Sequence, residues 1–186
     1  IAKEAAGRAL GGGGFLAGIP GSIGGALAMN AGAFGYETWT LVESVELVSR
    51  EGVVQSCDRS RFTPSYRNVD VPEEHWFVSA VLRFNAKSNI ESEQEIREFL
   101  AQRSASQPTG QASCGSVFKN PPGDFAGRLI EEAGLKGVGC RGCHVSSKHA
   151  NFIINDGGAS AVDIEELITE VRESVARKFG VILEPE

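Results

Sequence analysis

The first 35 residues contain 11 of the chain's 23 glycines, and this crowding constrains the fold more than any other feature of the sequence. An ordered glycine costs roughly 0.5–1 kcal/mol relative to alanine in a regular element, because it loses more backbone freedom on folding. The segment therefore predicts turns with positive φ, or backbone amides that lie against a ligand. The only methionine is Met29 and the sequence begins with Ile1, from which we expect a piece of a longer or processed protein.

Composition and charge exclude several classes of protein. The chain is 41% apolar and 23% charged, as globular proteins are. No apolar run approaches the roughly 20 residues of a membrane span. A net charge of −6 argues against nucleic-acid binding, which depends on clustered Lys and Arg. Four cysteines are too few for a secreted disulfide scaffold and no signal peptide is visible, so we expect a cytoplasmic protein that does not bind membranes.

Two nucleotide-binding loops were candidates for the glycine-rich segment. A P-loop is excluded because no Gly-Lys-Ser or Gly-Lys-Thr occurs. Residues 12–17 fit the dinucleotide pattern G-x-G-x-x-A, with Glu37 about 20 residues further on, as that pattern requires. The residues before it are rich in alanine and favour a helix, whereas the pattern should follow a strand. A packed Gly/Ala turn region is favoured over a dinucleotide site, although Ser22 and Asn30 leave an anion or cofactor cradle open.

Residues 37–86 are predicted to be mostly β structure. Val42–Asp58 alternates apolar and polar residues around a turn at 50–52, which indicates a hairpin, and Trp76–Phe84 indicates a further strand. At Ser88 the pattern changes, and residues 91–105 have helical spacing. We therefore expect an inter-domain boundary near Ser88.

The C-terminal hundred residues are predicted to interleave helices and strands. The sequence predicts an extended segment at 115–119, a helix at 124–133 closed by Gly134, and strands at 152–155 and 181–183. Ser160, with Asp163 three positions later, predicts a capped helix start. The apolar stripe of that helix consists of Ile164, Leu167, Ile168, Val171 and Val175. An α+β or α/β layer is expected here.

Five blocks of the sequence together carry a resemblance. They are GIPGSIGGALAMNAGAFGYE (18–37), SYR (65–67), GSVFKNPPGDFAGRLIEEAGLKG (115–137), VSSKHANFIIN (145–155) and KFGVILEPE (178–186). In order and spacing they resemble UDP-N-acetylenolpyruvoylglucosamine reductase, and they extend over nearly the whole chain. The spacing of 49 positions between Arg67 and Ser116 is similar to that of the shorter type of this family, which lacks an extra substrate-covering insertion.

The resemblance implies an α+β fold in two parts. Residues 1–87 would form the second half of an FAD-binding domain of the vanillyl-alcohol-oxidase-like (PCMH) type. Residues 88–186 would form a smaller α/β substrate-binding domain. Family chains carry another glycine-rich loop, for the FAD pyrophosphate, before this region. We therefore expect the chain alone to purify colourless and a version extended at its N-terminus to be yellow.

The resemblance also implies an activity, the NADPH-dependent reduction of UDP-N-acetyl-3-O-(1-carboxyvinyl)-glucosamine to UDP-N-acetylmuramate for peptidoglycan synthesis. The family reaction adds a hydride from reduced FAD to the vinyl carbon, so it needs a group that binds the carboxylate and a proton donor. By the resemblance, Arg67 binds the carboxylate and Ser116 donates the proton. Glu186, with its carboxyl protonated, would hydrogen-bond the developing charge. A serine hydroxyl is a weak acid, so Lys119 is its expected helper.

Binding residues follow from the same resemblance. FAD is expected against the backbone of the glycine-rich segment, at Gly18, Pro20, Gly21, Ser22, Gly24, Gly25, Asn30 and Gly32. Tyr66, Lys119 and Asn120 are expected to bind the UDP-sugar substrate, and no metal site is expected. Because the chain as a whole is acidic, local cations such as Arg67, Lys119 and Lys148 have to attract this anionic substrate.

Two alternatives stay open beside this hypothesis. One is a different flavin oxidoreductase of the same FAD-binding fold, which the Arg67 and Ser116 blocks disfavour. The other is a cofactor-free, inactive fragment or binding module. The oligomeric state is open, with a monomer favoured, and the residues that dock NADPH are not indicated. In block 145–155 we interpret His149 and Asn155 as structural.

The cysteines invite a further interpretation. Cys140 and Cys143 form a C-x-x-C motif and, with His144 and His149, could formally supply four zinc ligands. His144 adjoins the second cysteine too closely for the usual paired spacing, and the motif does not open a helix as thioredoxin-like motifs do. We interpret it as a turn. Cys114 lies two residues before the expected proton donor, so an alkylating reagent there is expected to block the site.

Overall fold

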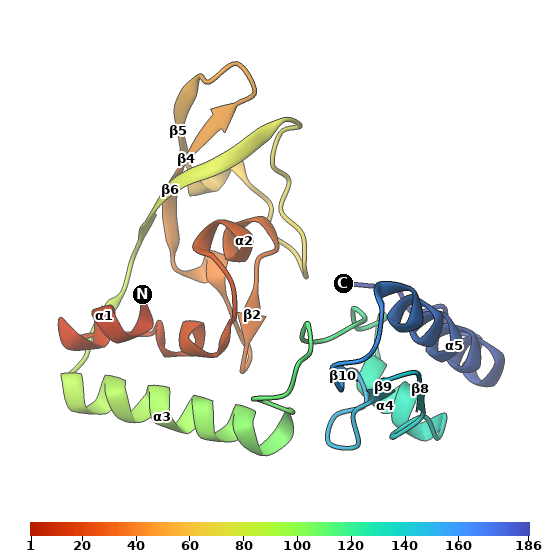
Figure 1. The fold of residues 1–186 in the computed structure, drawn as a ribbon. Coiled ribbons are helices and arrows are strands. Elements are labelled where there is room, and N and C mark those ends of the chain that lie inside the picture. The colour runs from red at the N-terminus through yellow and green to blue at the C-terminus, as the bar shows by residue number, and fades with distance from the viewer. The chain divides into compact units, whose positions relative to one another are not determined.

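The computed structural model describes all 186 residues, which divide into two compact units, residues 1–103 and 104–186 (Figure 1). The change of sequence pattern led us to expect the boundary between residues 87 and 88. Helix α3 (Asn89–Ser106) accounts for the difference, because most of it packs on the first unit. Ile96 of this helix is buried there in a small apolar cluster. The division therefore comes near the end of α3 and not at its start.

The first unit contains a three-stranded antiparallel sheet with the order β5-β4-β6. The strands are β4 (Val42–Ser49), β5 (Val54–Asp58) and β6 (His75–Leu82). The predicted hairpin is confirmed, because Val45 pairs with Cys57 across an antiparallel register. The strand predicted at 76–84 corresponds to β6. Residues 37–86 are therefore the β-rich part of this unit, as the alternation indicated.

Helix α2 (Ile23–Ala28) packs against this sheet and fixes the glycine-rich segment to it. The core between them consists of Leu27, Trp39, Val42, Val45, Leu47, Cys57, Phe62 and Val69. Trp39 is the largest of these side chains, and its Nε1 donates to the carbonyl oxygen of Leu27 over 2.7 Å. The indole therefore meets both of its requirements, an apolar environment for the ring and a partner for the N–H.

The other elements of the glycine-rich end are short. Helix α1 (Ala2–Gly7) lies alongside α3, and confirms the helix expected at the alanine-rich start. The remaining elements of the first unit are β1 (Leu10–Gly11), η1 (Gly14–Gly18), β2 (Gly32–Ala33), β3 (Tyr36–Glu37), η2 (Thr38–Thr40), η3 (Arg59–Arg61) and β7 (Asn85–Ala86). Some glycines are required by packing alone: a Cβ on Gly13 would lie 2.4 Å from the ring of Phe84.

The second unit combines two helices with a small antiparallel sheet. Its elements are α4 (Ala126–Glu132), β8 (Gly139–Cys140), β9 (Cys143–Val145), β10 (Ile153–Asn155) and α5 (Ala161–Phe179). The sheet order is β10-β9-β8, and both strand pairs are antiparallel. The expectation of an α/β domain was therefore wrong in type, since an α/β layer rests on parallel strands. Each unit is α+β.

Helix α5 follows its sequence signals closely. Ser160 caps it, and Ser160 and Asp163 form the reciprocal bonds of a capping box. Its predicted stripe faces the core, with Leu167 and Val171 at most 1% exposed. The helix ends at Gly180, whose φ of 69° is the left-handed conformation that favours glycine.

The strand predicted at 181–183 is absent. Instead, one isolated antiparallel bridge joins Pro185 to Phe118. The apolar run Val181–Leu183 is used for packing, since Leu183 is buried in the core of this unit. The β-bridge to Phe118 forms only after that run, at Pro185. None of the helices is long and apolar enough to cross a membrane.

Candidate active site

Tyr66 and Arg67 form the tip of a tight turn in the first unit. Ser65 and Asn68 close this turn with two backbone hydrogen bonds, of 2.9 and 3.2 Å. Arg67 has a φ of 54°, which is uncommon outside glycine. Its guanidinium carbon lies 5.0 Å from the centre of the Tyr66 ring. The turn thus presents a cation beside an exposed aromatic ring, a combination suited to an anionic ligand with a flat or sugar-like part.

Asn30 holds this turn from inside. Its side chain is fully buried, and its Nδ2 donates to the Ser65 carbonyl oxygen (3.1 Å) and to Glu37 Oε2 (2.9 Å). Its Oδ1 accepts from the backbone N–H of Trp39 at 3.2 Å. From the sequence, Asn30 was expected to be a polar handle for FAD. In the fold its side-chain amide is bonded within the protein, and its backbone N–H donates to the Leu27 carbonyl oxygen at 3.4 Å.

Gly24 and Gly25 lie inside helix α2 without a packing reason. A Cβ on either would meet only the hydroxyl of Ser22, at 3.9 and 3.5 Å, and neither has a positive φ. Glycine inside a helix costs about 1 kcal/mol relative to alanine. Ser22 itself caps the helix, because its Oγ accepts from the Gly25 N–H at 3.1 Å. Space is therefore kept open along this helix, as a flat cofactor lying against the backbone would require.

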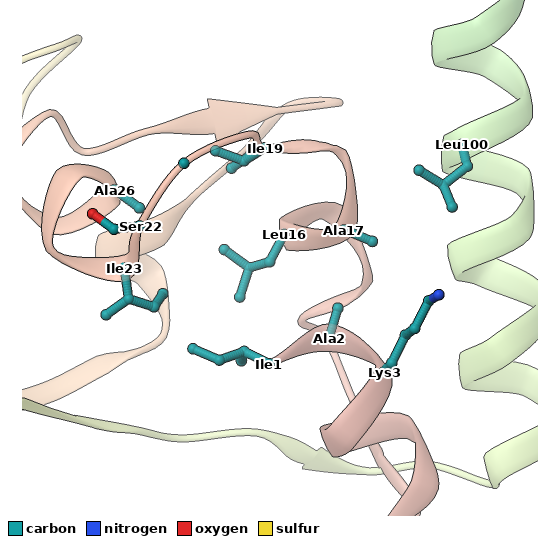
Figure 2. A pocket seen from close by; sticks show the side chains of 11 residues that line it. Ile1, Ala2, Lys3, Leu16, Ala17, Ile19, Ser22, Ile23, Ala26 and Leu100 are labelled. Carbon is teal, nitrogen blue, oxygen red and sulfur yellow. The ribbon is translucent and has the colours of Figure 1, made fainter. Parts of the chain in front are cut away.

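A pocket of about 410 Å³ opens beside the turn that precedes α2 (Figure 2). Its lining residues are Ile1, Ala2, Lys3, Leu16, Ala17, Ile19, Gly21, Ser22, Ile23, Ala26 and Leu100. Most of these side chains are apolar, and they come from α1, η1, α2 and α3 and from the residues that flank the first three of these helices. Of the residues expected to bind FAD, only Gly21 and Ser22 line it. Pro20 lies between Ile19 and Gly21 in the same turn.

The other two glycines expected at the cofactor have reasons within the protein. A Cβ on Gly18 would lie 3.0 Å from the Phe34 ring. A Cβ on Gly32 would lie 2.5 Å from the carbonyl oxygen of Tyr36, across the β2–β3 hairpin. Packing is therefore sufficient to require glycine at position 32, and a side chain at position 18 would require the Phe34 ring to shift by a few tenths of an ångström. The case for a cofactor cradle is stronger at Gly24 and Gly25.

In the second unit, the Ser116 segment lies beside the C-terminal segment. The Glu186 N–H donates to the Val117 carbonyl oxygen, and the Lys119 N–H donates to the Glu184 carbonyl oxygen, both at 2.9 Å. Ser116 is partly buried. Two residues that were expected to be catalytic, Ser116 and Glu186, are thus brought to neighbouring backbone positions although they are far apart in the sequence.

Three comparisons with known proteins identify relatives of this chain. The family model of the UDP-N-acetylenolpyruvoylglucosamine reductase C-terminal domain matches residues 107–186. The reductase of Alkalilimnicola ehrlichii is 53% identical over 96% of this chain, and that of Methylococcus capsulatus 57% identical over 92%. The crystal structure of the Thermus caldophilus reductase covers the whole chain with a TM-score of 0.88 and 34% identity, and 67% of its own chain is covered. The chain belongs to the UDP-N-acetylenolpyruvoylglucosamine reductase family.

The match extends over only part of those relatives. The chain spans 60% of the length of the Alkalilimnicola reductase and 57% of that of the Methylococcus reductase. Within the reductase family model lie Ser116, Lys119, Asn120 and Glu186, whereas Arg67 lies before it. The solved reductase structure covers both units.

Lys119 and Asn120, the expected substrate residues of this reductase-family unit, have partners in the fold. Lys119 Nζ lies 2.7 Å from Glu184 Oε1. Asn120 Oδ1 accepts from the Ala126 N–H at 3.0 Å, at the start of α4. Lys119 was expected to assist Ser116. In the fold its ammonium group is held by Glu184, on the segment that ends with Glu186.

Sequence reasoning missed Asn151, although it lies in one of the five blocks. It is 4% exposed and bonds both backbone groups of Phe118. The two residues considered in that block have structural contacts. Burial lowers the pKa of His149, and its Nδ1 accepts from the Asn151 N–H at 3.2 Å. Asn155 Oδ1 accepts from the Gly157 N–H at 2.9 Å.

The C-x-x-C motif is the turn of the β8–β9 hairpin, as interpreted from the sequence. Cys140 and Cys143 are paired residues of the two strands. Arg141 and Gly142 between them both have positive φ, 46° and 85°, as a two-residue hairpin requires. All four cysteines of this reductase-family chain are free thiols, and Cys114 is exposed.

Proposed function

We propose that this chain contributes to a reductase that uses NADPH and FAD to convert UDP-N-acetyl-3-O-(1-carboxyvinyl)-glucosamine to UDP-N-acetylmuramate for peptidoglycan. Family membership supports the reaction class. The observation that carries the proposal is the backbone pairing of the Ser116 segment with the segment that ends in Glu186. A proton donor and a second carboxyl group at adjacent positions suit a reaction that builds negative charge beside a carboxylate.

The cofactor part of the proposal is supported by the chain's own backbone. Residues 18–32 would hold FAD, with Gly24 and Gly25 keeping a bare helix surface open against it. When bound, FAD supplies the hydride that is added to the substrate, with NADPH as the reductant. The segment is oriented from within the protein, because the side chain of Asn30 joins it to the turn that carries Arg67.

Arg67 is proposed to bind the substrate carboxylate. A guanidinium offers paired donors to a carboxylate and keeps its charge, so it stabilises the charge that spreads from the neighbouring carbon. Tyr66, which is 47% exposed and stacks with the guanidinium, would contact the same ligand. Asn30 fixes the turn on which both residues lie.

Ser116 is proposed to donate the proton that completes the reduction. The hydride adds to the terminal vinyl carbon, the C=C π pair moves to the neighbouring carbon, and the hydroxyl proton of Ser116 goes to that carbon. The resulting alkoxide needs a nearby cation or donor, and Lys119 and Asn120 lie on the same segment. Glu186 would hydrogen-bond the carboxylate as its charge rises.

The remaining parts of the proposal concern compartment and partners. Four free thiols suit the reducing cytoplasm. The partners are small molecules, the UDP-sugar and NADPH. The net charge of −6 means that an anionic substrate has to be attracted by local cations such as Arg67, Lys119 and Lys148.

A chimera tests the proposal. In it, this chain replaces the matching 172 residues of the Methylococcus capsulatus reductase, and the rest of that relative is kept. We expect a yellow protein that oxidises NADPH only when the enolpyruvyl substrate is present, with a product two hydrogens heavier. The unmodified relative is the control. A yellow chimera that NADPH reduces, but that the enolpyruvyl substrate fails to reoxidise, would contradict the proposed substrate.

A further inference from the structure

We propose that Asn151 is a positioning residue for the proton-transfer step, one that sets the backbone on which Ser116 lies. This inference rests on the proposed function, because it assigns Asn151 to the step in which Ser116 gives up its proton. Asn151 is argued to act through that backbone and not by touching the substrate.

Asn151 makes contacts like those of a neighbouring β-strand, two through its side chain and one through its backbone carbonyl. Its Oδ1 accepts from the Phe118 N–H at 3.0 Å, and its Nδ2 donates to the Phe118 carbonyl oxygen at 2.8 Å. Its own carbonyl oxygen accepts from the Val117 N–H at 2.9 Å. Three hydrogen bonds therefore join Asn151 to the two residues that follow Ser116.

The opposite edge of the same segment is paired with the C-terminal segment. There the Val117 carbonyl oxygen accepts from Glu186, and the Lys119 N–H donates to Glu184. Phe118 points its N–H and carbonyl to the Asn151 edge instead. The segment is thus a single extended strand, with the C-terminal segment bonded to one edge. Asn151 is bonded to the other edge, where no second strand pairs.

Before Ser116, the chain is next joined to the rest of the unit at Ala112, whose carbonyl oxygen accepts from the Asn155 N–H at 2.9 Å. Gly115 has a φ of 93°, and a Cβ placed on it would meet nothing within 4 Å. The position of Ser116 is therefore set mainly by the residues after it, Val117 and Phe118, which are both buried. A change at Asn151 should move the Ser116 hydroxyl, and proton transfer is sensitive to small displacements of the donor.

The substitution Asn151→Asp separates this role from simple space filling. Aspartate has nearly the same shape and can still accept from the Phe118 N–H, but it faces the Phe118 carbonyl without a donor. Protonation of the buried carboxyl at low pH restores a donor. The matched control is Asn155→Asp in the same block, since Asn155 mainly accepts hydrogen bonds from a turn.

The experiment uses the chimera and follows the two half-reactions separately. For Asn151→Asp we expect NADPH to reduce the flavin at the unchanged rate, while reoxidation by the enolpyruvyl substrate slows at least tenfold. Activity relative to the parent should rise as the pH falls. In a Ser116→Ala background the same change should slow reoxidation less than twofold, because residues that act as a unit are non-additive.

Three results would overturn the inference while leaving the proposed function in place. They are reoxidation as fast as in Asn155→Asp, a full tenfold effect in the Ser116→Ala background, and equal slowing of both half-reactions. If Asn151→Asp fails to fold, Asn151→Ser replaces it, judged by the same split between half-reactions. A parent chimera that the substrate never reoxidises would instead reject the proposed function, and this inference with it.

Discussion

The side-chain amide of Asn30 donates to the carbonyl oxygen of Ser65 over 3.1 Å, across 35 residues of sequence. The same amide nitrogen donates to Glu37, and the amide oxygen accepts from the Trp39 N–H. A buried asparagine thus ties the end of the glycine-rich segment to the turn that carries Arg67. If FAD lies along that segment, one side chain sets both the cofactor surface and the residue proposed to bind the substrate carboxylate.

Exchanging the donor and acceptor at this junction tests its role. Asn30→Asp removes the donor to Ser65 and places a carboxylate beside Glu37, so we expect a loss of about 1–3 kcal/mol in the free energy of unfolding. Adding Glu37→Gln restores a bond between positions 30 and 37, and with it most of the stability. In both variants the Ser65 carbonyl lacks its donor. We therefore expect both to raise the KM of the chimera for the enolpyruvyl substrate several-fold. A double variant with the parental KM would show that the Ser65 bond does not position Arg67.

Ser116→Ala in the chimera tests the proton donor. NADPH should reduce the flavin as before, whereas reoxidation by the enolpyruvyl substrate should slow by about 10²–10⁴, the usual contribution of a general acid. Stopped-flow absorbance of the flavin measures both steps. Ser113→Ala, on an exposed position of the same loop, is the control. Unchanged reoxidation in Ser116→Ala would remove this hydroxyl from the mechanism.

Alkylation should separate the four thiols. Cys114 and Cys140 are exposed, whereas Cys57 and Cys143 are buried, and burial raises the pKa of Cys143. Iodoacetamide at neutral pH should therefore modify the exposed pair first, as peptide mass spectrometry can measure. Activity should be lost with modification at Cys114, so Cys114→Ser should protect the chimera and Cys140→Ser should not. Equal protection by both changes would place the effect elsewhere.

His149 should make the stability depend on pH below neutrality. Burial lowers its pKa in the fold, and the nearby Lys136 adds to this. The unfolded chain therefore binds the proton more strongly, and stability falls as the pH drops below about 6.5, the ordinary value for histidine. Above that value His149 contributes no such dependence. His149→Gln should flatten the fall in thermal midpoint below pH 6.5, and an unchanged slope would assign it to other groups.

The cap of α5 gives a prediction about stability alone. Ser160→Ala removes the hydroxyl that accepts from the Asp163 N–H, so we expect a loss of about 1 kcal/mol and a thermal midpoint a few degrees lower. Ser160→Thr keeps the cap and should keep most of the stability. Calorimetry of the chain measures both. A loss as large in Ser160→Thr would mean that the hydroxyl bond is not the cause.

The features predicted correctly from the sequence are those whose causes lie within a few residues. The capping box of Ser160 and Asp163 and the hairpin turn between Cys140 and Cys143 need only local bonds and permitted φ values. The amphipathic stripe of α5 needs only the helical period. The errors also had local origins. The apolar run Val181–Leu183 has the composition of a strand, yet its Leu183 packs in the core and pairing begins only at Pro185.

The candidate site divides in the same way, between features set by local sequence and contacts between distant residues. The five sequence blocks identified the family, and within them they indicated Arg67, Ser116 and Glu186 as residues to examine. No local pattern indicates that Glu186 pairs with Val117, or that Asn30 and Asn151 are buried supports for the segments that carry Arg67 and Ser116. These are bonds between distant residues, and a buried amide becomes informative only when its partners are known, since it must satisfy every donor and acceptor that it takes out of water. The sequence by itself determined the family, the capped helix α5 and the hairpin turns, and only the tertiary structure decided which buried asparagines support the segments of the candidate site.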